Sequence, residues 1–267
     1  MPGRIGRALE EAARGRSAAF VPFLTSGFPD PAESDRLAWA LCEEGADVLE
    51  LGIPFSDPLA DGPVIQRTTE AALRAGATPA RALEQARRLR ARHATAIVLM
   101  TYLNPVLRYG AERFAHEAAE AGVDGVLFVD LPPEEDPVLW EGFRAAGLDT
   151  IAMLSPTTDP ARLPAIARRA SGYLYVVARL GVTGAGGADP AILPALRAVR
   201  EVTPLPRCLG FGFHLGSDLA PWRGHAEGVI VGSALLATIL EGQSADEREA
   251  RARAFARSFR HALTGWT

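Results

Sequence analysis

The chain contains no lysine, because all 28 of its Lys+Arg residues are arginine. A chain without lysine cannot hold a carbonyl substrate or pyridoxal phosphate as a lysine Schiff base. It also cannot form the G-x-x-x-x-G-K-[ST] phosphate loop, in which a lysine contacts the phosphates. The absence of lysine therefore excludes two large classes of chemistry for this chain on its own.

Cysteine and long apolar runs are also scarce. The two cysteines, Cys42 and Cys208, are far apart and belong to no C-x-x-C motif, so we expect neither a disulfide framework nor a zinc site. No apolar run approaches the roughly 18 residues of a membrane span, and the N-terminal segment has no apolar core of a secretory signal. We therefore expect an unprocessed cytoplasmic protein without membrane contact.

Charge and histidine spacing exclude further classes of function. The net charge is −4, whereas a protein that binds nucleic acid needs a clustered basic face, so we expect no nucleic-acid partner. The five histidines form no H-E-x-x-H motif and no close pair, so we expect no metal site.

The length and the apolar pattern predict a closed α/β barrel. A (β/α)8 TIM barrel typically needs about 250 residues, and this chain has 267, with 48% hydrophobic residues and no low-complexity linker. We therefore expect a single TIM-barrel domain over residues 1–267. Short apolar runs predict eight strands, at residues 18–24, 48–53, 96–100, 125–129, 150–154, 173–177, 207–210 and 228–231.

Segments with helical spacing separate these strands, at residues 32–44, 79–92, 111–121, 137–146, 161–170 and 190–202. The alternation of strand and helix predicts parallel pairing. An open doubly wound sheet usually carries G-x-G-x-x-G after its first strand, and this chain has none, which favours the closed barrel. We also expect an extra N-terminal helix at residues 5–14 and a closing helix at residues 245–263.

The carboxylates that follow the second predicted strand are the first candidates for chemistry, because barrel active sites lie at the C-terminal ends of strands. Alternation places Leu49 and Leu51 under the helices and Glu50 inside the barrel, where burial would raise its pKa. The alternative for Glu50 is a salt bridge to an arginine of the barrel. Asp61 follows on a proline-rich loop, where it either carries chemistry or caps the turn before Gly62.

Three other polar positions have weaker signals. Asp57, before Pro58, is expected to form a turn, and Asp130 either caps a stiff loop or carries chemistry. Tyr102 and Tyr175 lie at or just past strand ends, where they either line a pocket or belong to the core.

Glycines that follow the last three strands predict a phosphate site. They lie in the segments 181–187, 210–212 and 232–234, and the last segment opens a helix. Bare backbone N–H groups and a helix N-terminus favour an anion, and phosphate sites after strands seven and eight recur in this fold. His214 is expected to be a loop residue near this cluster.

Six motifs resemble the tryptophan synthase alpha subunit family, and together they span nearly the whole chain: FVPFLT (20–25), ELGIPFSDPLADGPVIQ (50–66), MTYLNP (100–105), DLPPEE (130–135), GVTG (181–184) and VGSA (231–234). The resemblance implies a (β/α)8 barrel that cleaves indole-3-glycerol phosphate to indole and glyceraldehyde 3-phosphate, without a metal or organic cofactor. It also implies an alpha-beta-beta-alpha complex with a beta subunit, which carries pyridoxal phosphate on its own lysine.

The resemblance assigns roles to individual residues. Glu50 would be the general acid and base, and Asp61 would hold the indole N–H. Thr183 would contribute to the substrate site from a lid that closes over Asp61. The indole slot would be lined by Phe23, Met100, Tyr102, Leu127, Tyr175 and Phe211, and the phosphate would be bound by Gly184, Gly212, Gly232 and Ser233.

Four positions depart from the family pattern: Ala178, the segment Ala185-Gly186-Gly187, His214 and Glu227. Because added glycines raise the entropy cost of ordering a loop, these changes put lid closure and coupling to a beta subunit in question. One alternative is therefore a stand-alone lyase that supplies free indole to secondary metabolism. Another is a barrel that only activates its partner, although the presence of both Glu50 and Asp61 argues against it.

Overall fold

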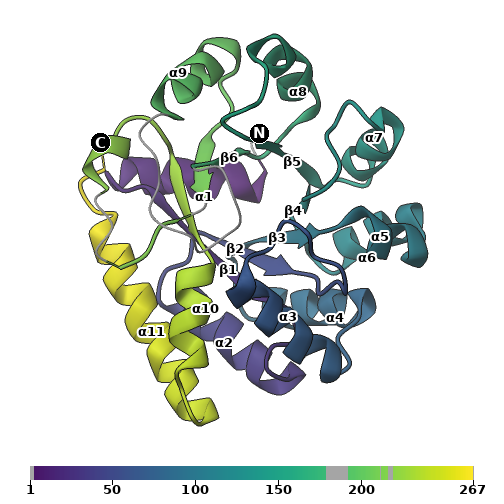
Figure 1. Cartoon of the computed structure of the whole chain (residues 1–267), viewed down its shortest axis with the longest axis vertical. Helices are drawn as coiled ribbons and strands as arrows, with labels where there is room; N and C mark the ends of the chain where they lie inside the picture. The colour runs from purple at the N-terminus through teal and green to yellow at the C-terminus, as the bar shows by residue number, and fades with distance from the viewer. Residues whose placement is uncertain (1–2, 179–191, 211, 216–218, 267) are drawn as a thin grey trace.

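The chain folds into a closed parallel β-barrel surrounded by helices (Figure 1). The computed structural model describes residues 3–178, 192–210, 212–215 and 219–266. The strands are β1 (Ala19–Thr25), β2 (Val48–Gly52), β3 (Ala96–Thr101), β4 (Gly125–Phe128), β5 (Asp149–Leu154), β6 (Leu174–Val177), β7 (Arg207–Gly210) and β8 (Gly228–Val231). Each strand pairs in parallel with the next, and β8 pairs with β1. The predicted barrel is confirmed, and each predicted strand ends within one residue of its observed position.

Helices cover the outside of the barrel. They are α1 (Arg4–Arg14), α2 (Pro31–Glu43), α3 (Pro63–Arg74), α4 (Pro79–Arg90), α5 (Leu103–Tyr109), α6 (Ala111–Glu120), α7 (Pro137–Ala145), α8 (Leu163–Arg169), α9 (Leu193–Val202), α10 (Ser233–Leu240) and α11 (Ala245–Ala262), with short 3₁₀ turns at Pro160–Arg162 and Ala220–Trp222. Several of these starts are readable from the sequence, because a capping side chain precedes a proline. Asp30 caps α2, Thr78 caps α4 and Asp136 caps α7.

Two helices, α3 and α5, were not predicted. Helix α3 follows the proline-rich segment after β2 and starts at a glycine without a side-chain cap. Helix α5 has only 7 residues, with Pro105 in its first turn. The short helix α5 is held by tertiary packing rather than by local signals, whereas α3, with 12 residues, is as long as the predicted α4. Both matter for function, because α3 and the residue before α5 contribute side chains to the candidate site.

The core has two layers, and the alternation along β2 confirms the expected orientation. Leu49 and Leu51 pack in the layer between the strands and the outer helices, whereas Val48 belongs to the barrel interior. Ile5 and Leu9 of α1 pack against this interior layer, so the predicted N-terminal helix is confirmed and covers one end of the barrel. Full burial of each such aliphatic side chain is worth about 1.5–3 kcal/mol.

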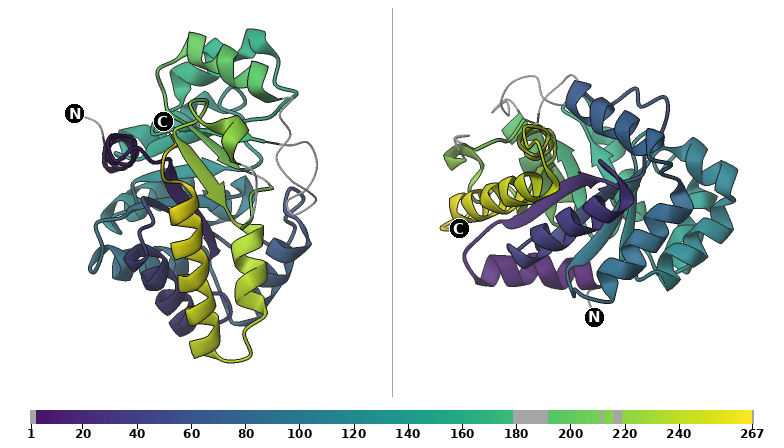
Figure 2. Two further views of the ribbon diagram at one scale, coloured as in Figure 1. Left: turned by 90° about the vertical axis from the view of Figure 1, so that its left-hand side faces the viewer. Right: turned by 90° about the horizontal axis from the view of Figure 1, so that it is seen from below.

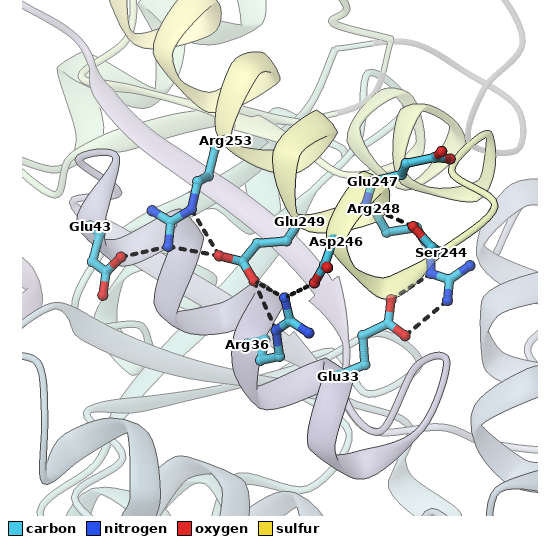
Figure 3. Close-up of polar contacts among 9 residues, drawn as sticks. All are labelled: Glu33, Arg36, Glu43, Ser244, Asp246, Glu247, Arg248, Glu249 and Arg253. Carbon is cyan, nitrogen blue, oxygen red and sulfur yellow. Dashed lines mark hydrogen bonds and ion pairs between the residues drawn. The ribbon is translucent and has the colours of Figure 1, made fainter.

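Helices α10 and α11 form a hairpin and lie side by side, as the left view in Figure 2 shows. The ion pairs in Figure 3 join α11 to α2. Arg36 of α2 donates to Asp246 at 2.7 Å and to Glu249 at 2.9 Å. Arg253 of α11 donates to Glu43 at 2.7 Å and also reaches Glu249. Arginine suits these bridges because its planar guanidinium can contact two carboxylates at once.

The most buried of these pairs joins Arg248 to Glu33. The two Glu33 carboxylate oxygens face Nε and Nη2 of Arg248, and Nη1 donates to the carbonyl of Gly242 at 3.0 Å. The Glu33 side chain is only 6% exposed, against 21% for Arg248. The pair therefore fixes the α10–α11 turn against the start of α2.

Arg248→Met is expected to lower the free energy of unfolding by about 2 kcal/mol, because it leaves a buried carboxylate without its hydrogen-bond donors. Urea unfolding at low salt would measure this loss. Arg14→Met is the control, since its pair with Glu10 is 72% and 56% exposed and should contribute less than about 0.5 kcal/mol. Equal effects of the two substitutions would contradict the importance of the buried pair.

Candidate active site

Two small adjoining cavities open at the C-terminal ends of the strands. The first, of about 30 Å³, contains Glu50, and the second, of about 10 Å³, contains Asp61. Phe23, Ile65 and Met100 line both cavities, so these three side chains form a wall between them. The structure thus brings the two candidate carboxylates to one region of the barrel mouth.

Glu50 lies on β2 inside the barrel, opposite Phe23 of β1 in the strand register, and its side chain is fully buried. Its Oε1 accepts a hydrogen bond from the hydroxyl of Tyr173. Its Oε2 has no hydrogen-bond partner within the described part of the chain, and the same residues include no arginine paired with Glu50. The salt-bridge alternative therefore finds no support.

Burial raises the pKa of Glu50 to about 7, although the hydrogen bond from Tyr173 partly opposes the shift. A carboxyl group with this pKa is present in both its protonated and ionised forms near neutral pH. That balance suits a group that must first give a proton and then take one back.

Asp61 lies at the end of the loop between β2 and α3 and is 7% exposed. Its backbone carbonyl accepts a hydrogen bond from the Gln66 side chain at 2.7 Å, which fixes the loop to the first turn of α3. Burial raises the pKa of the Asp61 carboxyl to about 6, and a hydrogen bond with Tyr102 partly opposes the shift. Two buried carboxyl groups with different pKa values therefore face adjoining cavities.

The other acidic candidates have structural contacts. Asp57 is exposed, and its carbonyl accepts a hydrogen bond from Leu59 at 3.0 Å, as expected for a turn. Asp130 accepts a hydrogen bond from the backbone N–H of Leu103 at 2.8 Å and so caps the start of α5. The capping alternative for Asp130 is therefore favoured by its contacts.

The apolar walls include most of the residues expected for an indole slot. Phe23, Met100, Tyr102 and Tyr175 line the cavities, whereas Leu127 is fully buried deeper in the barrel interior. Phe211, Thr183 and Gly184 lie outside the described residues. The sequence reasoning missed several further lining residues: Ile53, Ile65, Thr69, Val129, Phe213 and Ile230.

Two glycines make room for these aromatic walls. A Cβ at Gly52 would lie 2.4 Å from Cζ of Phe23, and a Cβ at Gly210 would lie 2.2 Å from the hydroxyl oxygen of Tyr175. These distances are far below van der Waals contact, so any side chain there would displace the ring. The positions of Phe23 and Tyr175 therefore each require a glycine on the neighbouring strand.

The glycine cluster lies beside Glu50. Gly212, Gly232 and Ser233 line the Glu50 cavity, and Ser233 is the first residue of α10. The first backbone bond of α10 runs from Leu236 to the carbonyl of Gly232, and the first turn holds no acidic residue. The backbone N–H groups that precede Leu236 form no bond within the helix, and together with the helix dipole they suit an anion. His214 is exposed in the loop after β7, as expected.

The departures from the family pattern lie in different places. Ala178 is fully buried directly after β6, and the segment 185–187 lies outside the described residues. Glu227 precedes β8 and forms an ion pair with Arg207 at the first residue of β7. Because both residues lie at the N-terminal ends of their strands, Glu227 is remote from the barrel mouth. The effect of Glu227 on closure and on coupling to a beta subunit stays a prediction.

The described residues contain no group of three or more His, Cys, Asp or Glu side chains that could hold a metal ion. Within those residues, no helix is both long and apolar enough to cross a membrane. Cys42 and Cys208 are buried and free, and the cytoplasmic location expected from them stays a prediction.

Comparisons with known proteins agree on one family. The family model described as "Tryptophan synthase alpha chain" matches residues 9–264. The tryptophan synthase alpha chain of Burkholderia pseudomallei (strain K96243) is 45% identical over 256 residues, which cover 95% of this chain and 94% of that protein. The alpha chain of Geobacter sulfurreducens is also 45% identical, over 87% of this chain and 89% of its own length.

Solved structures give the same result. A Mycobacterium tuberculosis tryptophan synthase chain superposes with a TM-score of 0.90 and 34% identity, covering 98% of this chain and 99% of its own. Tryptophan synthase subunit alpha from Legionella pneumophila gives a TM-score of 0.86 and 38% identity, with the same coverage of both chains.

Proposed function

Since this chain belongs to the tryptophan synthase alpha chain family, we propose that Glu50 and Asp61 carry out its lyase reaction. That reaction cleaves indole-3-glycerol phosphate to indole and D-glyceraldehyde 3-phosphate in the biosynthesis of L-tryptophan. The observation that carries the residue assignment is the position of Glu50. It is fully buried, it has an unpartnered Oε2 among the described residues, and it shares a cavity with the start of α10.

The substrate has two ends that match the two cavities. Its phosphate would bind the N–H groups at Gly232 and Ser233, where the dipole of α10 stabilises negative charge. Its indole ring would enter between Phe23 and Met100, and the ring N–H would donate to Asp61. Because Phe23 and Met100 line both cavities, the ring would move them aside as it binds.

Glu50 would act first as an acid and then as a base. Protonated Glu50 gives its proton to C3 of the indole ring, which turns the ring into a cationic indolenine. The ionised Glu50 then takes the proton of the glycerol hydroxyl next to C3 as the carbon–carbon bond breaks. The bonding electrons return to the ring, which leaves as indole, and the hydroxyl carbon becomes the aldehyde. One proton enters and one leaves, so Glu50 ends in its starting state.

Asp61 would stabilise the cation between these two steps. A carboxylate at the indole N–H attracts the positive charge that develops on the ring nitrogen, and the low polarity of the buried site strengthens this attraction. The substrate thus supplies its own electron sink, so a lysine iminium is unnecessary. This role agrees with a chain that contains no lysine.

We also propose a beta subunit as the partner, with pyridoxal phosphate bound to that chain. Three strongly exposed apolar side chains follow three consecutive strands: Leu59 after β2, Leu107 on α5 after β3, and Val138 on α7 after β4. Their exposed fractions are 89%, 51% and 83%. Leu107 and Val138 also line a groove of about 680 Å³ between α6 and α7. Exposed apolar side chains grouped in this way are typical of a docking surface.

Val138→Asp is expected to weaken binding of a cognate beta chain about tenfold or more, because it places a charge in an apolar contact. Indole release by the isolated chain should stay unchanged, since Val138 is not among the residues that line either cavity. Val202→Asp is the control, because Val202 is 40% exposed on α9, outside this group. Equal affinities of the two variants would contradict this docking surface.

Steady-state formation of indole and glyceraldehyde 3-phosphate from indole-3-glycerol phosphate tests the reaction itself. It would be measured for the isolated chain and again with a beta chain. Stimulation by the beta chain is expected for a two-component synthase. The stand-alone lyase has no support among the named relatives, and a lack of stimulation would be the result that favours it.

A further inference from the structure

The loop between β2 and α3, residues 53–62, has an exposed tip followed at once by a buried carboxylate. Ser56, Asp57, Leu59 and Ala60 are exposed, whereas Asp61 is buried. The described contacts within the tip are short-range: Leu59 bonds to the carbonyl of Asp57, and the hydroxyl of Ser56 bonds to the Asp57 side chain. The Gln66 side chain holds the Asp61 carbonyl against α3, so a second contact, to the strand ends, would fix the tip and Asp61 relative to the barrel.

Tyr102 makes such contacts on both arms of the loop. On the first arm, the ring of Phe55 packs against the Tyr102 ring, with a centroid distance of 5.3 Å. On the second arm, the backbone N–H of Ala60 donates to the Tyr102 hydroxyl at 3.1 Å. The next residue is Asp61, which lines one cavity together with Tyr102. One side chain thus joins the two arms on either side of the exposed tip.

Tyr102 itself is held firmly. It is 6% exposed and directly precedes α5, at the C-terminal end of β3. Its carbonyl accepts a hydrogen bond from the Thr101 hydroxyl at 3.0 Å, and the next backbone N–H, of Leu103, is bonded to Asp130. The tyrosine therefore connects the loop to the end of β3, where hydrogen bonds hold the backbone at Tyr102 and at Leu103.

We propose that Tyr102 is a positioning residue, whose hydroxyl fixes Ala60 and thereby the Asp61 carboxylate, in addition to forming a wall of the slot. This inference rests on the proposed role of Asp61. It gives the aromatic ring and the hydroxyl of Tyr102 separate functions. The ring packs on Phe55 and the ligand, and the hydroxyl sets the geometry of the carboxylate.

The chemistry makes this geometry important. Asp61 must meet a single N–H on a rigid ring, and a displacement of about 1 Å of a group in an active site can lower the rate 10²-fold. The hydrogen bond with Tyr102 also opposes the rise in the pKa of Asp61 that burial causes. Loss of the hydroxyl should therefore both loosen the loop and raise the pKa of Asp61 further.

Tyr102→Phe tests the inference, because it keeps the ring and removes only the hydroxyl. We expect kcat/KM for indole-3-glycerol phosphate to fall about tenfold, mainly through kcat, as for the loss of one or two hydrogen bonds. The acid limb of the pH profile should move to higher pH. Amide hydrogen exchange should become faster in residues 55–61 and stay unchanged in the strands.

Tyr109→Phe is the matched control. Its hydroxyl donates to Glu117 on the neighbouring helix α6, away from both cavities. It should leave kcat/KM, the pH profile and exchange in residues 55–61 as in the parental chain.

The outcomes separate this inference from the proposed function. Unchanged exchange in residues 55–61 of Tyr102→Phe would overturn it. Faster exchange with unchanged kcat and pH profile would also overturn it, since Tyr102 would then serve only the loop structure. A rise in KM alone would also overturn it, because Tyr102 would then act only as a wall of the slot. If the parental chain released no indole, the proposed function would fail, while the exchange result would still decide whether the hydroxyl fixes the loop.

Discussion

Glu50→Gln is expected to reduce indole release from indole-3-glycerol phosphate below detection, a loss on the order of 10⁴-fold or more. An amide can neither give a proton to the ring nor take one from the glycerol hydroxyl, so both steps assigned to Glu50 fail together. The side chain keeps its size and can still accept a hydrogen bond from Tyr173. Binding of the substrate, measured by calorimetry with the variant, should therefore change little.

The stability of the variant provides the control for this result. Burial raises the pKa of Glu50 in the folded chain to about 7, above its ordinary value of 4.5. The folded state then holds a proton that the unfolded state loses, so stability falls as pH rises from 4.5 toward 7. Glu50→Gln removes this pH-dependent loss of stability, so the variant should be at least as stable as the parental chain at pH 8. A folded variant that kept near-parental kcat would show that Glu50 is not the proton carrier.

Asp61→Asn is expected to lower kcat/KM by about 10²- to 10⁴-fold, which is less than the loss at Glu50. The asparagine can still accept a hydrogen bond from the indole N–H, but it offers no negative charge to the indolenine. The loss should therefore appear mainly in kcat. Asp57→Asn is the matched control, because Asp57 lies on the same loop with its side chain exposed.

The pH profile gives this prediction a second readout. The reaction needs ionised Asp61, whose pKa is about 6, and protonated Glu50, whose pKa is about 7. The parental kcat/KM should therefore be highest between these values and fall on both sides. Asp61→Asn should lose the acid limb and keep the alkaline limb. An acid limb that persisted in the variant would assign it to another group.

The sequence predicted the strands well because both faces of each are buried. A buried parallel strand appears as a short, continuous apolar run, so residues 207–210 and 228–231 could be bounded from the pattern alone. The same alternation correctly placed Glu50, because Leu49 and Leu51 needed the outer layer. The phosphate cluster was visible because backbone binding needs glycine.

The walls of the site were harder to predict, because they depend on spatial neighbours. Ile65 and Thr69 come from α3, a helix that was not predicted, so their place in the walls was not predicted either. Phe213 has no sequence motif of its own, yet it lines the Glu50 cavity from the segment after β7. Glu227 departs from the family pattern, and its ion pair with Arg207, at the N-terminal ends of β7 and β8, could be located only in three dimensions.

Because β8 pairs with β1, the barrel can close only after β8 has been synthesised. Glu50 and Asp61 are synthesised before Gly232 and Ser233, which directly follow β8. Phe23 of β1 lines the same cavity as Gly232, and it also lines the cavity of Asp61. A growing chain that has released β1 through β6 therefore carries its acid/base groups without the backbone that would hold the phosphate. The substrate site is therefore complete only after both β8 and the start of α10 have been made and β8 has paired with β1.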